Sequence, residues 1–305
     1  MWDSMIIGAG PAGLTAAIYL ARYRRRFLVM HDERSRARWI PRTRNHPGFP
    51  AGVKGTALLS LMEQQAKRYG AEIRRGRADT IKTIPGGFAV SGTGFAEEAR
   101  TVLLALGVSD LRPSIPGIED AIRRGLVRIC PICDGYEVAD TRVAVLTDSD
   151  LGAAEALFLR TWTDRLTVVL TGSAEAIGPK RRAELAAEGI QLVSAAVEDI
   201  VLRPRTVELR SRPEPGLTFD HLYTAFGVQP RNALAAGVGA PTNSEGYLLA
   251  GQLHQETAVR GLYVAGDAVR GLNQISVAQA EAAIAATSIH NLLRELEREP
   301  EFAGA

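Results

Sequence analysis

Residues 4–24 read SMIIGAGPAGLTAAIYLARYR, and this stretch carries the strongest structural signal in the chain. The apolar residues through Ile7 predict a buried parallel strand, and the Ala- and Leu-rich run after Gly13 predicts a helix. Gly8, Gly10 and Gly13 stand at the three glycine positions of a GxGxxG motif. Gly8 would permit the tight turn, Gly10 would let the backbone approach a pyrophosphate, and Gly13 would let helix and strand pack closely. The stretch therefore predicts a dinucleotide-binding strand–turn–helix.

A second predicted strand, at residues 27–30, strengthens this interpretation because two acidic residues follow it. Asp32 or Glu33 stands at about the right distance from the glycines to bond ribose hydroxyls. Pro11 and Ala12 open the predicted helix, whose free N–H groups and dipole favour a bound phosphate. The alternative is a glycine-rich turn that holds no ligand. We expect an α/β fold, doubly wound around a parallel sheet.

A second nucleotide-binding segment, GLYVAGD at residues 261–267, lies towards the C-terminus. Its apolar strand delivers the Asp267 carboxylate onto a turn of small residues, which suits a polyol hydroxyl. The Ala-rich stretch 273–286 predicts a helix that packs tightly under a flat ligand. A further strand at residues 222–226, followed by Gly227, is the kind of element that completes an adenine-dinucleotide fold. This part of the chain therefore adds to the predicted nucleotide site.

The only two cysteines of the chain stand in one CxxC segment, CPICDG at residues 130–135. A structural disulfide over so short a spacing would close almost no loop and would remove little unfolded-state entropy. A structural zinc site needs four ligands, and no second CxxC or close pair of histidines supplies the rest. Dithiol/disulfide redox chemistry remains, because a short loop lets the two sulfurs join and separate with little backbone movement.

Length and composition are those of an ordinary globular protein. At 305 residues the chain is long enough for one large or two medium domains. Its formal net charge of +2 indicates neither a nucleic-acid nor a membrane-surface partner, and no apolar run reaches transmembrane length. The first residues lack the basic region of a signal peptide, so we expect a cytoplasmic protein. Residues 22–44 hold nine arginines, which form either a solvated surface or a docking site for an acidic protein.

Together these motifs resemble those of the low-molecular-weight thioredoxin reductase family. The shared order is GAGPAG, then NHPGFP, then CxxCDG in mid-chain, and finally VAGD followed by a Gln-containing helix. The resemblance implies a FAD-binding domain of residues 1–113 and 228–305, with a Rossmann-like domain of residues 114–227 inserted into it. The insert would carry both cysteines and the NADPH site. Pro- and Gly-rich linkers at residues 111–117 and 226–232 bracket it.

Carried over position by position, the resemblance implies a role for each matching residue. Cys130 and Cys133 would form the redox pair, and Asp134 would be the general acid that protonates a departing thiolate. Asp267 would bind the ribitol chain, and Gln274 would bond the edge of the isoalloxazine ring. The family also implies a homodimer, with a thioredoxin-like protein or a small disulfide or dithiol as its partner. The complete implied FAD site is Gly8, Gly10, Pro11, Ala12, Gly13, Asp32, Asn45, Gly107, Gly266, Asp267, Gln274 and Ile275.

The insert departs from the family pattern where NADPH would bind. Residues 147–150 read Thr-Asp-Ser-Asp, which replaces glycines of the family's nucleotide loop and adds negative charge. The family's His-Arg-Arg run, which grips the 2′-phosphate, is Leu-Thr-Gly here at residues 170–172. Arg181 and Arg182 could compensate only if the following loop folded back. Two losses at opposite ends of one ligand predict that NADPH is not the physiological reductant.

Three functions remain open. The favoured one is a FAD-dependent disulfide oxidoreductase of the thioredoxin reductase type, with a ferredoxin-like protein as one candidate donor. The second is a dithiol oxidase that passes electrons from a substrate dithiol to O₂, which the CPxCxGYE run at residues 130–137 also resembles. The family's oxidases usually carry His after the second cysteine, whereas Asp134 favours reduction because a carboxylic acid donates a proton. The third is a non-catalytic redox sensor whose disulfide state sets its shape or its partner.

Overall fold

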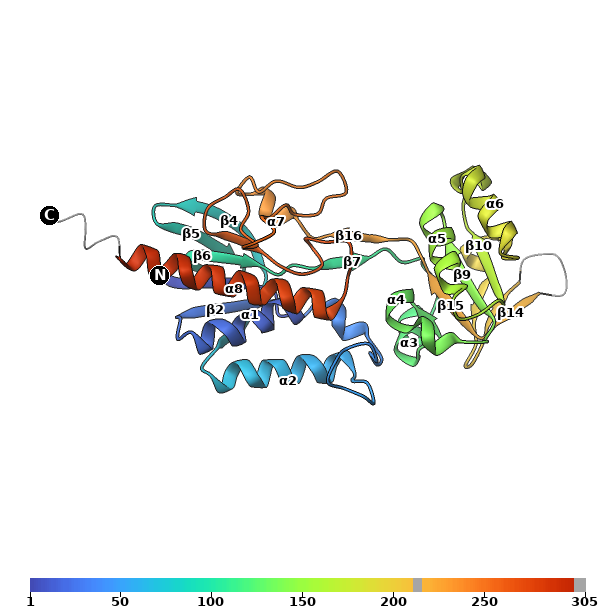
Figure 1. Ribbon diagram of the computed structural model, residues 1–305, viewed down its shortest axis with the longest axis horizontal. Helices are drawn as coiled ribbons and strands as arrows, with labels where there is room; N and C mark the ends of the chain where they lie inside the picture. The colour runs from blue at the N-terminus through green and yellow to red at the C-terminus, as the bar shows by residue number, and fades with distance from the viewer. Residues whose placement is uncertain (211–215, 299–305) are drawn as a thin grey trace. The chain divides into compact units, whose positions relative to one another are not determined.

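The computed structural model describes residues 1–210 and 216–298 of the chain (Figure 1). Residues 211–215 and 299–305, which belong to the predicted insert and to the predicted FAD-binding domain, lie outside the described residues. The chain divides into two compact units. The first unit consists of residues 1–38, residues 55–109 and the residues from Gln229 on. The second unit consists of residues 39–54 and 110–228.

The first unit is built around a seven-stranded sheet in which β3, β2, β1 and β6 lie side by side and parallel, with β17 also parallel to β6. Strands β5 and β4 extend the sheet in antiparallel pairing. Strands β1 and β2 are almost wholly buried, as central parallel strands are. The bounds are β1 (Trp2–Ile7), β2 (Phe27–His31), β3 (Glu72–Arg75), β4 (Ala78–Ile84), β5 (Gly87–Gly92), β6 (Phe95–Leu104) and β17 (Leu262–Val264).

Helices α1 and α8 pack against each other and against one face of this sheet through small side chains. Ala16 and Ala17 of α1 and Ala282 and Ala285 of α8 are completely buried in this contact, because alanine lets two helices approach closely. The helix predicted over residues 273–286 begins two residues later and continues well beyond that range. The helices of this unit are α1 (Pro11–Arg22), α2 (Gly55–Arg68), which packs on α1, α7 (Ala233–Ala236) and α8 (Ile275–Arg298).

The second unit contains a wholly parallel five-stranded sheet in the order β11-β10-β9-β15-β8. The strand predicted at residues 222–226 is β15, which lies between β9 and β8; the expectation that it completes the adenine-dinucleotide fold of the first unit was therefore wrong. The elements are β8 (Val127–Arg128), β9 (Val143–Thr147), β10 (Leu166–Leu170), β11 (Gln191–Ser194), β15 (His221–Thr224), α3 (Ile118–Arg124), α4 (Pro131–Asp134), α5 (Asp150–Leu159) and α6 (Pro179–Ala187), with a small antiparallel sheet of β12 (Ile200–Leu202), β13 (Val207–Leu209) and β14 (Leu217–Phe219).

Residues 39–54 belong to the second unit, although the sequence predicted them in the FAD-binding domain. The guanidinium carbons of Arg112 and Arg123 lie 4.3 Å and 5.2 Å from the centre of the Trp39 ring. These cation–π contacts, together with packing of the indole on the core of the second unit, explain why the segment that begins at Trp39 belongs to this unit. The two connecting segments, β7 (Val108–Asp110) and β16 (Val228–Pro230), pair with each other.

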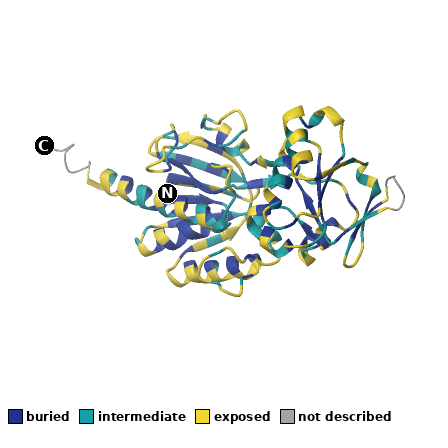
Figure 2. Cartoon of the chain, turned by 45° about the vertical axis from the view of Figure 1, so that its right-hand side comes forward, coloured by how far each residue is buried: buried dark blue, intermediate teal, exposed yellow. Residues whose placement is uncertain are grey.

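The predicted class, a doubly wound α/β fold with a second Rossmann-like domain inserted in the first, is confirmed. Figure 2 shows the pattern that this class requires, since the central strands of both units are buried while the helices covering them expose their outer faces. Within the described residues, no helix is both long enough and apolar enough to cross a membrane.

Candidate dinucleotide and disulfide sites

The glycine motif of the first unit lies where the carboxyl ends of several parallel strands meet. The Gly8 N–H donates to the Met30 carbonyl at 2.8 Å, which joins the ends of β1 and β2. The Ala105 N–H donates to the Ile7 carbonyl at 2.9 Å at the end of β6. Nucleotides bind doubly wound folds at this edge of the sheet. The motif is therefore placed correctly for a dinucleotide.

Two of the motif glycines are required by packing. Gly8 has φ +113°, and a Cβ there would lie 2.3 Å from the Ala105 carbonyl oxygen. A Cβ on Gly13 would lie 1.8 Å from the Gly8 carbonyl oxygen, so helix α1 can pack this closely on β1 only without it. Helix α1 has no acidic residue in its first turn. Its N-terminus therefore suits a pyrophosphate.

The two nucleotide motifs, far apart in sequence, come together in the first unit. Gly266 has φ +88°, and a Cβ on it would lie 3.1 Å from the Ala12 Cβ at the start of α1. The following carboxylate, Asp267, lies 3.9 Å from the Arg36 guanidinium. Gln274 directly precedes α8 and Ile275 is its first residue. All predicted FAD residues except Asn45 belong to this unit.

The remaining FAD candidates of this unit are also held by defined contacts. The Arg34 guanidinium donates to the Asp32 carboxylate at 2.7 Å. Burial opposes ionisation of Asp32, but the hydrogen bonds and charge of Arg34 outweigh it and lower the pKa of this carboxyl. Gly107 has φ +65°, and its carbonyl accepts a hydrogen bond from the Arg231 N–H at 3.1 Å. Asp32 and Gly107 both lie outside the helices and strands of the fold, as ligand-binding residues often do.

Glu281 is a site residue that was not predicted from the sequence. Its side chain is only 4% exposed although it lies on the Ala-rich face of α8. One carboxylate oxygen accepts the Gly266 N–H at 2.8 Å, and the other accepts from Arg270 at 2.5 Å. Glu281 therefore fixes the turn that presents Asp267. A lone acidic residue on the apolar face of a predicted helix was the available signal.

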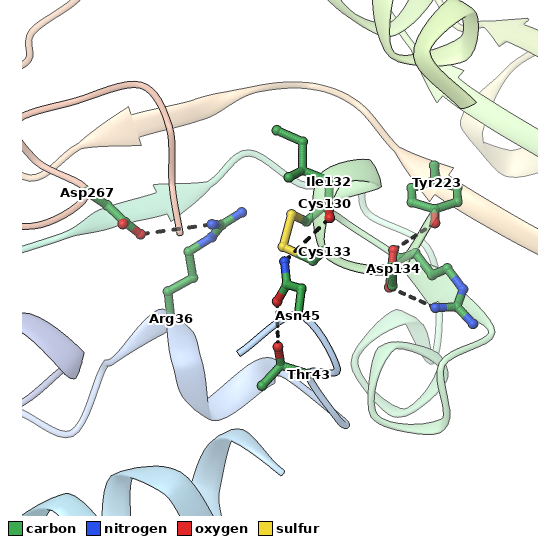
Figure 3. The surroundings of a disulfide bond; sticks show 10 residues. Arg36, Thr43, Asn45, Cys130, Ile132, Cys133, Asp134, Tyr223 and Asp267 are labelled. Atoms are coloured by element: carbon green, nitrogen blue, oxygen red, sulfur yellow. Dashed lines mark hydrogen bonds and ion pairs between the residues drawn. A yellow bond between two sulfur atoms is a disulfide. The ribbon is translucent and has the colours of Figure 1, made fainter. Parts of the chain in front are cut away.

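The two cysteines form a disulfide at the start of α4 in the second unit (Figure 3). Their Cα atoms are 5.3 Å apart, and the Cys133 N–H donates to the Cys130 carbonyl at 3.0 Å. Ile132, between them, is half exposed. The last residue of the motif, Gly135, must be a glycine because the Trp162 ring packs on it, and a Cβ there would lie 2.5 Å from the ring. The sequence motif thus forms a compact, accessible redox pair.

Asn45 belongs to the second unit, where it lies next to the disulfide, whereas the other FAD candidates belong to the first unit. Its side-chain oxygen accepts from the Thr43 hydroxyl at 2.8 Å. Its amide nitrogen lies 3.5 Å from the carbonyl of Ile132, the residue between the cysteines. Within its unit, Asn45 therefore supports the backbone of the CxxC loop.

The Asp134 carboxylate, directly after Cys133, turns towards two side chains (Figure 3). Arg128 donates to one oxygen at 2.8 Å, and the Tyr223 hydroxyl donates to the other at 2.7 Å. Burial raises the pKa of Asp134, and the neighbouring Arg128 charge opposes that shift. Burial and the Asp134 charge raise the pKa of Tyr223 well above its usual range, so the phenol keeps its proton and donates. Neither partner of Asp134 was predicted from the sequence.

The turn between β9 and α5, where the resemblance places the NADPH site, is occupied by polar side chains. Thr147 is fully buried, and its hydroxyl donates to the Ala225 carbonyl at 2.9 Å. The Ser149 N–H donates to the same hydroxyl at 3.2 Å. Asp150, in the first turn of α5, accepts from the Gly178 N–H at 2.9 Å. The Ser149 N–H, a backbone donor of this turn, is therefore already engaged by a side chain.

The two arginines that could compensate for the missing basic run make other contacts. Arg181 donates to Glu184 at 2.7 Å. The Arg182 guanidinium donates to the Ile177 carbonyl at 2.8 Å and also bonds the Ala174 carbonyl. Their charged groups thus bind their own helix and the segment before it.

Most arginines of the stretch at residues 22–44 contact carboxylates, aromatic rings or backbone carbonyls within their own units. Arg38 pairs with Glu33 at 3.5 Å, Arg44 pairs with Glu137 at 3.4 Å, and Arg26 lies over the Trp2 ring. These contacts fit a structural surface better than a docking site for an acidic protein. The same holds for the other contacts, made by Arg22, Arg25, Arg34, Arg36 and Arg42.

Comparison with known proteins agrees with this geometry. Residues 2–282 match the profile of the pyridine nucleotide-disulphide oxidoreductases. The chain is 31% identical over 314 residues to the bifunctional thioredoxin reductase/thioredoxin of Mycobacterium leprae (strain TN), covering 96% of this chain and 66% of that protein. It therefore spans slightly less than two thirds of that relative. It is 29% identical to the thioredoxin reductase of Bacillus subtilis (strain 168), covering 97% and 96% of the two chains.

Solved structures are similar along the whole chain. The structure of HlmI has a TM-score of 0.90 at 27% identity and covers 100% of this chain and 96% of that one. The atypical thioredoxin reductase TRi from Desulfovibrio vulgaris Hildenborough has a TM-score of 0.55 at 30% identity and covers 97% and 99%.

A doubly wound fold that carries a CxxC disulfide on its inserted unit is the framework of a flavin-dependent disulfide oxidoreductase, and this is the class of the present enzyme. The chain belongs to the pyridine nucleotide-disulphide oxidoreductase family, among its low-molecular-weight thioredoxin reductases. The family implies FAD, and the glycine-lined edge of the first unit fits that cofactor.

Proposed function

We propose that this enzyme moves electrons between FAD and the Cys130–Cys133 pair and on to a protein or small-molecule disulfide, without NADPH as its donor. The single observation that carries the proposal is the filled turn between β9 and α5. A thioredoxin-like protein is the proposed partner because relatives of this chain are named thioredoxin reductase. We also propose a cytoplasmic homodimer, as expected for this family.

FAD would be held by the residues of the first unit. Gly8, Gly10 and Gly13 keep the edge of the sheet clear for a pyrophosphate on the N-terminus of α1. The Asp32 and Asp267 carboxylates would accept hydrogen bonds from ribose and ribitol hydroxyls. Bound FAD would supply a two-electron carrier that exchanges electrons with a dithiol/disulfide pair.

The side chains and the charge of the turn between β9 and α5 both disfavour NADPH binding to the second unit. The Thr147 side chain stands where the family has a glycine that lets the backbone approach a pyrophosphate, and it is buried and bonded to the Ala225 carbonyl. Asp150 places a carboxylate in the first turn of α5, where the family's phosphates would sit. Two unit charges about 4 Å apart repel by roughly 4 kcal/mol at an effective dielectric constant of about 20. Arg181 and Arg182 are engaged elsewhere and do not offset this repulsion.

A dithiol oxidase is the second candidate, and the hydrogen bonding of Asp134 favours it. Both oxygens of this carboxylate accept hydrogen bonds, which suits a charged group that takes a proton from an incoming thiol. A substrate dithiol would then lose two electrons and become a disulfide, while Cys130–Cys133 opens to a dithiol. O₂ would be the final acceptor.

Steady-state turnover with different donors tests the proposal. Purified holoenzyme would be assayed with NADPH, NADH and reduced ferredoxin, each with oxidised thioredoxin as acceptor, and with dithiothreitol and O₂. We expect NADPH to support turnover about 100-fold more slowly than the best donor, since a binding loss of roughly 3 kcal/mol corresponds to that factor. An authentic NADPH-dependent thioredoxin reductase is the positive control. Comparable NADPH-driven reduction would contradict the proposal, and dithiol-dependent O₂ uptake would select the oxidase.

A further inference from the structure

The Asp134 carboxylate is held by two side chains from adjacent strands. Arg128 ends β8 and Tyr223 lies within β15, and these two residues are direct partners in the parallel pairing of the strands. Their side chains reach the same carboxylate from neighbouring positions, at 2.8 Å and 2.7 Å. The pairing of β8 with β15 therefore places both donors against the Asp134 carboxylate, next to the redox pair (Figure 3).

The hydrogen bonds that Arg128 and Tyr223 donate to Asp134 match a charged carboxylate. An arginine side chain stays protonated in proteins and can only donate. Tyr223 also donates, because its raised pKa keeps the phenol protonated. A carboxylate has only acceptors, so both bonds are satisfied when Asp134 is ionised. A proton on either oxygen would compete with one of these donors.

The other charged and titratable groups near Asp134 act in both directions. Glu137, from the short 3-10 helix after α4, raises the pKa of Asp134, and its own carboxylate pairs with Arg44 at 3.4 Å. His221, two residues before Tyr223 on β15, has its pKa lowered by burial and by Arg128. Burial itself favours the neutral acid. Arg128 and Tyr223 are therefore the groups that oppose neutralisation of Asp134.

We propose that Arg128 and Tyr223 are positioning residues that hold Asp134 fixed and charged, so that it accepts the proton of a thiol arriving at the Cys130–Cys133 disulfide. The inference rests on the second candidate function above, in which a substrate dithiol opens this disulfide. The incoming S–H gives its proton to Asp134, and the new thiolate attacks one sulfur of the disulfide. The S–S bond breaks, a mixed disulfide forms, and the released cysteine thiolate takes up the proton. The second substrate thiol then completes the two-electron exchange.

The pH dependence of disulfide opening tests this inference. Oxidised holoenzyme would be mixed anaerobically with dithiothreitol at about pH 5 to 9, and the opened cysteines would be trapped by alkylation and counted by mass spectrometry. Flavin absorbance would be followed in parallel. The quantity of interest is the ratio of the opening rates of each variant and the wild type, because this ratio cancels the titration of dithiothreitol itself.

Arg128→Gln is expected to slow opening only within a defined pH window. Loss of an adjacent cation raises a carboxyl pKa by roughly one to three units. Between the wild-type and the raised pKa, Asp134 of the variant is protonated and cannot accept the thiol proton, so the rate ratio falls below one. Above the raised pKa the ratio returns towards one. Arg128→Lys should restore most of the rate, and Tyr223→Phe should give a smaller shift in the same direction.

Matched controls separate this effect from general damage to the fold. Arg142 pairs with Asp220 at 2.9 Å in the same unit, so Arg142→Gln removes the same kind of ion pair and should leave the pH profile unchanged. Tyr263→Phe is the control for a buried tyrosine. Asp134→Asn should slow opening, and adding Arg128→Gln to it should cause no further shift.

The possible outcomes are distinct. A ratio of one at every pH, a ratio above one within the window, or an equal effect of Arg128→Gln in the Asp134→Asn background would each overturn the inference. If dithiothreitol neither opens the wild-type disulfide nor bleaches the flavin, the proposed function fails instead.

Discussion

Replacing Gly13 with alanine is expected to release FAD and to destabilise the first unit. The new Cβ would lie 1.8 Å from the Gly8 carbonyl oxygen, so α1 must move away from β1. Overpacking of this kind costs about 3 kcal/mol, and a comparable loss of binding energy weakens FAD affinity about 100-fold. The ratio of flavin to protein absorbance after gel filtration, with fluorescence titration of FAD and thermal unfolding, measures both effects.

Two further variants make this prediction specific. Gly10→Ala is milder for the fold, since its Cβ would lie 3.2 Å from the Ser35 side-chain oxygen, but it should still weaken FAD binding. Gly251→Ala, in the same unit, meets only the Glu256 carbonyl at 3.7 Å and should retain full flavin content. Normal FAD retention by Gly13→Ala would show that the dinucleotide site lies elsewhere.

Replacing either cysteine with serine is expected to lower turnover of disulfide or dithiol substrates by at least about 10³-fold, as for loss of a covalent nucleophile. The chain has no other cysteine, so no second thiol can substitute for the missing one. FAD content should be unchanged because Cys130 and Cys133 belong to the second unit. Turnover rates corrected for uncatalysed exchange, together with flavin content, measure the effect.

The double variant, with serine at both positions, is the control for residual activity. It should be as inactive as either single variant, because the two sulfurs act as one redox pair. Substantial turnover by any of these serine variants would mean that electrons bypass the disulfide. Such a result would also remove the basis for a thiol step at Asp134.

The features that could be predicted from sequence are those that short segments specify. The strand–turn–helix around Gly8 and Gly13 depends on local spacing, and its glycines are needed for contacts within that same segment. The CxxC disulfide also forms within one short segment. For both, residue type and spacing carry nearly all of the information.

The features that could not be predicted depend on contacts between distant segments. Residues 39–54 belong to the second unit because Trp39 packs against Arg112 and Arg123, which no local pattern reveals. Arg128 meets Asp134 and Tyr223 only through the pairing of β15 with a strand of two residues, too short to give a periodic signal. The general-acid role of Asp134 was implied by the family resemblance, and its two donor partners, which no sequence pattern reveals, lead us to propose a proton acceptor instead.

Anaerobic titration of the flavin with NADPH and with a dithiol shows which of the two reduces it. One equivalent of each reductant would be added to oxidised wild-type enzyme and to the Cys133→Ser variant, and the flavin absorbance would be followed. We predict that dithiothreitol bleaches the wild-type flavin but not that of the variant, and that NADPH bleaches neither. Rapid bleaching of the wild-type flavin by stoichiometric NADPH would contradict the account.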